Sequence, residues 1–115
     1  MYSGQDIINT IKSTQDTLSI CIKDLYKKGK AKAEAEMDYR VALAQKMLVE
    51  RDNGLPVTIL HDVCRGYREI AKLKMDRDIA ETLYDIVMQK IYALKIELSI
   101  AETVYKQEWG EAGRK

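Results

Sequence analysis

The sequence predicts an all-α protein that folds as an antiparallel helical hairpin or bundle with a long, coiled-coil-like C-terminal helix. Apolar residues recur in steps of three and four over most of the chain, which is the spacing of one helix face. Proline occurs once, beside the one strong turn signal, at 52–56. The content of 46% hydrophobic and 32% charged residues fits a folded, soluble, helix-rich chain. We expect one domain covering residues 1–115.

The C-terminal half carries the longest repeat. From Ile59 to Tyr105 the positions of one apolar seam alternate in steps of four and three, as in a heptad repeat. Its later positions include Tyr84, Val87, Ile91, Leu94, Leu98 and Tyr105. A second apolar stripe lies one residue back and contains Ile79, Leu83, Ile86, Ala93, Ile100 and Val104. Because the two stripes are wider together than a two-stranded coiled coil needs, we expect the 80–105 region to form the seam of a homo-oligomer.

Two apolar registers precede the turn, and they do not join. The first contains Ile7, Ile11, Thr14, Leu18, Cys21 and Leu25, and the second contains Met37, Val41, Ala44 and Leu48. The segment 27–36 between them contains Gly29 and no large apolar residue. We therefore expect helices at 4–28 and 30–52, and either a bend at Gly29 or an exposed stretch of continuous helix would explain the change of phase.

Two further helices are expected after the turn. Pro56 suits the first turn of a short helix at 56–65, and Gly66 is expected to cap or kink its C-terminal end. A long helix is then expected at 67–109, before Gly110.

No motif for catalysis, for a metal or for a cofactor is recognisable. Cys64 and His61 lie close in sequence, but we interpret Cys64 as a core residue and His61 as a surface residue. Two cysteines and one histidine lack zinc-ligand spacing, and no Glu-x-x-His motif or glycine-rich phosphate loop occurs. We expect a protein that is not an enzyme and that needs no cofactor.

The most suggestive cluster for ligand binding is Arg65-Gly66-Tyr67-Arg68, at the start of the long helix. Guanidinium groups bind phosphate and a tyrosine ring can stack on a base, while helix N-termini favour anions. Lys72 follows one turn later, and Arg40 or Arg51 could complete the site from the other arm. The cluster suggests a nucleotide or phosphate pocket, and the alternative is a helix junction with solvated charges and a packed tyrosine.

Arg77 occupies a seam position that apolar residues fill elsewhere. A polar residue on a seam often specifies register or oligomeric state. We expect Arg77 to have this role through an ion pair with Glu36 or Asp38, and lining a ligand pocket is the alternative.

Charge and hydropathy exclude several partners. The net charge of +1 argues against a DNA mimic and against nucleic-acid binding. The N-terminal segment lacks a basic region followed by an apolar one, and no long uncharged apolar stretch occurs. We expect a cytoplasmic protein with reduced thiols and no membrane contact.

The stretch from Tyr39 to Gly110 resembles small helical accessory proteins encoded by bacteriophages of Gram-positive bacteria. The resemblance is carried by Ala44-Gln45-Lys46-Met47-Leu48, Asn53-Gly54-Leu55-Pro56-Val57-Thr58, Arg65-Gly66, Glu69-Ile70-Ala71 and Lys106-Gln107-Glu108-Trp109-Gly110. It implies a non-enzymatic binding protein in the host cytoplasm that counters host immunity. Such a protein would either sequester a nucleotide-derived immune signal or block a host defence protein. The alternative is an oligomeric helical scaffold that assists phage replication, recombination or assembly.

Overall fold

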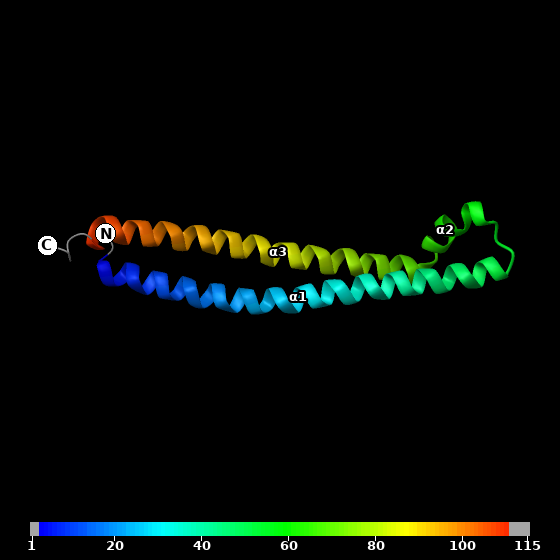
Figure 1. The fold of residues 1–115 in the computed structure, drawn as a ribbon, viewed down its shortest axis with the longest axis horizontal. Helices are drawn as coiled ribbons and strands as arrows, with labels where there is room; N and C mark the ends of the chain where they lie inside the picture. The colour runs from blue at the N-terminus through cyan, green and yellow to red at the C-terminus, as the bar shows by residue number, and fades with distance from the viewer. Residues whose placement is uncertain (1–2, 111–115) are drawn as a thin grey trace. The chain divides into compact units, whose positions relative to one another are not determined.

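The computed structural model describes residues 3–110, and every regular element in this part of the chain is a helix (Figure 1). The elements are α1 (Gly4–Asp52), α2 (Val57–Arg65), α3 (Arg68–Tyr105) and a terminal π-helical turn, η1 (Lys106–Gly110). The prediction of an all-α fold is therefore confirmed. None of the described helices contains a stretch long and apolar enough to cross a membrane.

The turn after α1 forms where the sequence predicts it. Gly54 has a φ of 96°, a conformation that costs glycine little. The N–H of Gly54 donates to the carbonyl of Arg51, and the N–H of Leu55 donates to the carbonyl of Glu50, both at 3.0 Å. This is the Schellman pattern, which satisfies carbonyls left free at a helix end. Pro56 then precedes the first residue of α2.

Gly66 separates the last two helices, as predicted. Its N–H donates to the carbonyl of Val63 at 3.0 Å, and the N–H of Tyr67 donates to the carbonyl of Cys64 at 3.3 Å. The backbone of Gly66 stays right-handed, with φ −83° and ψ −11°. Gly66 therefore ends α2 without reversing the chain, and α3 begins two residues later.

The chain divides into two compact units. Unit 1 joins Met1–Tyr26 to Ile86–Lys115, and unit 2 is Lys27–Asp85. Unit 1 therefore contains the N-terminal half of α1 and the C-terminal half of α3, whereas unit 2 contains the rest of both helices together with α2.

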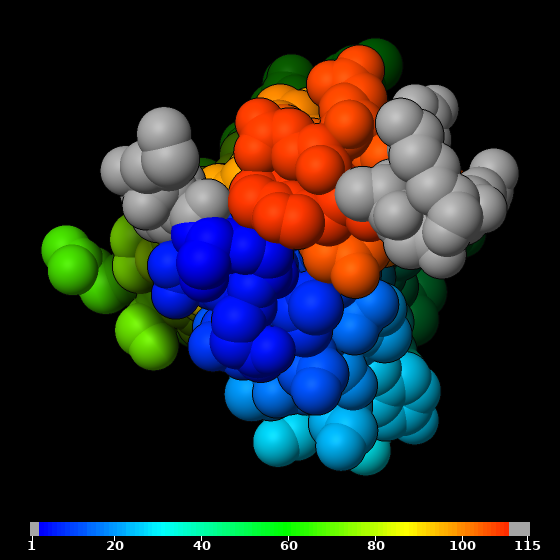
Figure 2. Space-filling model, turned by 90° about the vertical axis from the view of Figure 1, so that its left-hand side faces the viewer, coloured from blue at the N-terminus to red at the C-terminus, as the bar shows by residue number. Residues whose placement is uncertain are grey.

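Unit 1 is an antiparallel helix pair with a small apolar core. The core contains the buried residues Cys21, Val87 and Ile91, and Leu18, Leu25 and Leu94 pack against them. Near the end of the unit, the first residues of α1 lie against the last turns of α3 (Figure 2). A Cβ placed on Gly4 would lie 3.2 Å from the ring of Trp109, so glycine allows the indole to approach the backbone of α1. The Tyr105 and Trp109 rings have centroids 6.2 Å apart.

The residues predicted as an oligomer seam have a different role in unit 1. Val87 and Ile91 are buried against α1 of the same chain, and Leu94 packs beside them. Leu98 and Tyr105 are half-buried as well. The seam is therefore the interface between α1 and α3, because α1 is long enough to follow it. The second stripe stays exposed except at Val104, which is half-buried.

The first half of the chain requires a larger correction. Residues 4–28 and 30–52 lie in one continuous helix, which is one of the two expected alternatives, but the inner face of this helix in its second half is not the expected one. In unit 2 the face of α1 toward α3 continues the first register through half-buried or buried positions at Lys28, Lys32, Ala35, Tyr39, Ala42 and Lys46. The expected stripe of Met37, Val41 and Leu48 is exposed.

Lysine, arginine and tyrosine side chains replace aliphatic ones in this interface, so the spacing of apolar residues does not reveal this face of α1. The ammonium of Lys32 lies 4.6 Å from the centroid of the Tyr84 ring. Farther along the interface, Cζ of Arg77 lies 4.7 Å from the centroid of the Tyr39 ring, and the Lys46 ammonium lies 4.1 Å from the centroid of the Tyr67 ring. These are cation–π distances, and the apolar stems of Lys and Arg cover the helix surface below the charge.

Gly29 is not a bend. It lies inside α1, and a Cβ placed on it would lie 3.4 Å from Cε2 of Tyr84. A side-chain methyl group at position 29 would therefore be in ordinary van der Waals contact with the Tyr84 ring, and the packing does not require glycine there.

Candidate functional site

The sequence-predicted ligand residues all lie in unit 2, but the structure separates them. Arg65, the last residue of α2, is exposed and lines an open groove between α2 and α3. Arg68 and Lys72 line a second hollow on α3, which shares Gly66, Ala71 and Met75 with the first. Three of the five predicted residues are therefore neighbours.

The other two predicted residues lie elsewhere. Tyr67 faces α1, where its ring is covered by the Lys46 ammonium. Lys46 also lies 3.5 Å from Glu69 and 3.7 Å from Glu50. Arg40 is on α1, where its Nε donates to Glu36 at 2.7 Å. Tyr67 and Arg40 are therefore not among the residues that line the hollows beside Arg65, Arg68 and Lys72.

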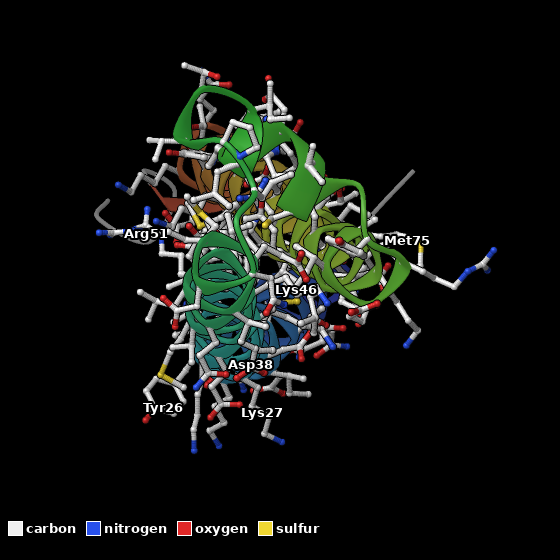
Figure 3. The ribbon with its side chains drawn as sticks, turned by 90° about the vertical axis from the view of Figure 1, so that its right-hand side faces the viewer. Tyr26, Lys27, Asp38, Lys46, Arg51 and Met75 are labelled. Carbon is white, nitrogen blue, oxygen red and sulfur yellow. The ribbon has the colours of Figure 1, made fainter. Side chains whose placement is uncertain are left out.

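The groove beside Arg65 lies between α2 and α3 and is named the α2–α3 groove. It has a volume of about 650 Å³ and is lined by Asp62, Arg65, Gly66, Ala71, Lys74, Met75, Asp78, Ile79, Thr82 and Leu83. Its floor consists of Met75, Ile79 and Leu83, which follow one another at four-residue steps on α3 and are about half exposed. Figure 3 shows Met75 projecting from α3 away from α1.

The rim of the α2–α3 groove carries charges of both signs. Arg65 and Lys74 are its cations, and Asp62 and Asp78 are its carboxylates. The ammonium of Lys74 lies 3.1 Å from Oδ2 of Asp78, so this cation is already paired. An aliphatic floor between mixed charges suits an amphipathic protein segment, whereas a phosphate-rich ligand would meet two carboxylates.

Asp78 connects the groove to the helix interface. The hydrogen bond from Lys74 and then that from Arg77 hold the pKa of Asp78 below its ordinary value. The Nε and Nη2 atoms of Arg77 lie 3.2 and 3.1 Å from Oδ1 of Asp78. The same pairing with Asp78 raises the pKa of Arg77, and Arg77 stays charged.

Arg77 faces the α1–α3 interface. Its Nε lies 3.4 Å from Oε2 of Glu36, and this confirms one of the two predicted partners. Asp38 does not pair with it, and the second carboxylate is Asp78. Arg77 also covers the Tyr39 ring, so it contacts two residues of α1, Glu36 and Tyr39. A shift of α1 along α3 would break both contacts, which favours the register role.

Burial separates the two residues that tempted a catalytic interpretation. Cys64 has no exposed surface, while the side chain of His61 is exposed and lies 3.9 Å from Asp62. They occupy the core and the surface respectively, as predicted. No group of three or more His, Cys, Asp and Glu side chains within residues 3–110 could hold a metal ion.

Two of the three residues of the groove floor belong to an apolar stripe that the sequence predicts. Ile79 and Leu83 were identified as members of a second stripe, but Met75 was not. The four-residue step from Met75 to Ile79 was the available signal, although it does not show that α2 forms the opposite wall.

No protein-family model matches the sequence, and neither a curated protein nor a solved structure is significantly similar to the chain. The function is therefore inferred from the residues of this protein and their arrangement.

Proposed function

We propose that this protein is a non-enzymatic binding protein that holds an amphipathic helix of a partner protein in the α2–α3 groove. The observation that carries this proposal is the row of Met75, Ile79 and Leu83, which lies half exposed along the groove floor. Residues spaced in this way match the apolar face of a helix laid into a groove. The charged rim would then set the orientation of the bound helix and exclude other partners.

Among the roles implied by the sequence resemblance, blockade of a host defence protein in the host cytoplasm agrees best with this groove. Sequestration of a nucleotide-derived signal requires cations and a ring that converge. Arg65, Arg68 and Lys72 are neighbours, but Tyr67 and Arg40 lie outside their site. We therefore rank protein blockade above nucleotide sequestration.

A helical scaffold is the second candidate function. It is favoured by the exposed apolar side chains of α1, which include Met37, Val41 and Leu48. A scaffold would bind several partners through long helix faces, and the α2–α3 groove would then be one contact among several.

Photo-crosslinking from the groove tests the proposal. A benzophenone amino acid replaces Ile79 in the groove or, as the control, Ile20, which is exposed on α1 in unit 1. Irradiation in a Gram-positive host should give a discrete crosslinked protein from position 79 and not from position 20. The same protein should then form a stoichiometric complex with the purified chain.

Variants then measure the contribution of the floor. A central apolar contact in an interface contributes about 2 kcal/mol or more, so Ile79→Asp should weaken the complex at least about thirtyfold. Ile20→Asp should leave the affinity unchanged. Equal affinity of Ile79→Asp and wild type would contradict the proposal.

Calorimetric titration with cyclic dinucleotides and ADP-ribose derivatives tests the nucleotide role. Saturable binding that Arg65→Ala and Arg68→Ala abolish would replace protein blockade by ligand sequestration.

A further inference from the structure

The outer face of α3 in unit 1 carries an unpartnered apolar stripe, here named the outer stripe: Ile86, Ala93, Ile96 and Ile100. Its isoleucines are 57%, 61% and 59% exposed in that order, and Ala93 is exposed as well. Ile86, Ala93 and Ile100 are spaced by seven residues, which places them on one line along the helix. The core of unit 1 uses the adjacent line through Val87, so α1 does not cover the outer stripe.

The arrangement of the outer stripe is self-complementary. Ile86 and Ile100 lie at equal distances in sequence on either side of Ala93. If two copies of α3 cross antiparallel at Ala93, Ile86 of each copy meets Ile100 of the other. Alanine at the crossing point allows the two helices to approach closely, because its side chain is a single methyl group.

The charges beside the outer stripe have nearly the same symmetry, because the midpoint between Lys90 and Glu97 lies between residues 93 and 94. Lys90 and Glu97 lie seven residues apart along one edge, and both are exposed. Neither forms an ion pair within residues 3–110, and four-residue steps along α3 reach only apolar side chains from either one. In the antiparallel arrangement, Lys90 of each copy lies beside Glu97 of the other, and this gives two reciprocal pairs. A parallel arrangement would separate Lys90 from Glu97 by two helical turns.

We propose that the protein is a homodimer in which two copies of α3 pack antiparallel through the outer stripe, with a two-fold axis beside Ala93. This is a symmetric interface in which the same patch meets itself. It uses residues of the second apolar stripe and not the seam through Val87, Ile91 and Leu94, which packs in the core of unit 1. The dimer does not depend on the proposed function, because the α2–α3 groove lies in unit 2.

Light scattering after size-exclusion chromatography tests the proposal on the full chain. At about 100 µM, well above a micromolar dissociation constant, the wild type should have twice the monomer mass of 13.2 kDa. Ala93→Glu places two carboxylates at the crossing point and should raise the dissociation constant by about two orders of magnitude. The control Ala31→Glu, at an exposed position of α1 in unit 2, should remain dimeric.

Charge reversal then tests the antiparallel direction. Lys90→Glu or Glu97→Lys alone should each raise the dissociation constant roughly fivefold, and the double variant should restore it to within about twofold. Circular dichroism of each variant checks that helix content is retained. A monomeric wild type, a dimer unaffected by Ala93→Glu, or failure of the double variant to recover would overturn the proposal. None of these results would alter binding at the α2–α3 groove.

Discussion

Replacing Tyr39 by alanine tests which face of α1 packs on α3. Tyr39 is 6% exposed, and the guanidinium of Arg77 lies 4.7 Å from its ring centroid. Truncating a buried aromatic side chain to alanine costs about 3–5 kcal/mol, and an exposed cation–π contact contributes about 0.5–1 kcal/mol. Because a helix pair surrounds the ring less completely than a deep core, we expect Tyr39→Ala to lower the free energy of unfolding by about 3 kcal/mol.

The matched variant is Met37→Ala, which changes the stripe that the sequence pattern favoured. Met37 is 56% exposed, so its truncation should cost no more than about 0.5 kcal/mol. Urea unfolding followed by circular dichroism at 222 nm measures both variants. Thermal unfolding should show a fall in Tm of about 12 °C for Tyr39→Ala and little change for Met37→Ala.

The unfolding free energies of the two variants distinguish between the two possible inner faces of α1. If Met37→Ala destabilises the protein as much as Tyr39→Ala, the inner face of α1 is the stripe of Met37, Val41 and Leu48. The α1–α3 register described above would then be wrong.

Two further predictions concern unit 2. Gly29→Ala should raise the free energy of unfolding by about 1 kcal/mol, because alanine favours helix and its Cβ would lie in ordinary contact with Tyr84 at 3.4 Å; a loss of stability in urea denaturation would instead indicate that α1 needs a bend at Gly29. Hydrogen bonds from Lys74 and Arg77 lower the pKa of Asp78, so its charge stabilises the fold above the unfolded pKa of about 3.9, and this contribution is lost as pH falls through the lower folded pKa. Between pH 5 and pH 2 the urea midpoint of the wild type should therefore fall further than that of Asp78→Asn, and equal falls would contradict this role.

The helix boundaries were predictable because local signals specify them. Asn53-Gly54 and Pro56 end one helix and begin the next through backbone conformations that few other residues provide. Gly66 likewise marks the end of α2. These signals depend on neighbours in sequence, so no knowledge of the packing was needed.

The packing faces were less predictable, because the helical spacing of apolar residues does not include lysine and arginine. In unit 2 the interface uses Lys32, Lys46 and Arg77 over tyrosine rings, and these residues have apolar stems that such spacing leaves out. Apolar spacing alone therefore favours Met37 and Leu48 as the inner face of α1, although both residues face solvent. Ion pairing of Arg77 with Glu36 was predicted because a charge on a seam needs a partner.

The candidate site shows the same division. The sequence predicted that Arg65, Arg68 and Lys72 are neighbours at a helix junction. In the structure these three residues line two adjoining hollows. It did not determine that Tyr67 turns to α1, since the direction of a side chain depends on the phase of the helix that carries it.

The sequence alone was enough to predict that this chain is helical, that helices end near residues 52 and 65, and that a heptad seam runs along α3. Turn residues and the spacing of apolar side chains act locally, so these properties could be read without coordinates. Three properties required the packed structure: α1 covers the seam, Tyr39 and not Met37 lies inside, and Ile79 forms part of a groove with α2. Those properties depend on which helix faces meet, and amphipathic lysine and tyrosine side chains allow more than one choice until the partner helix is in place.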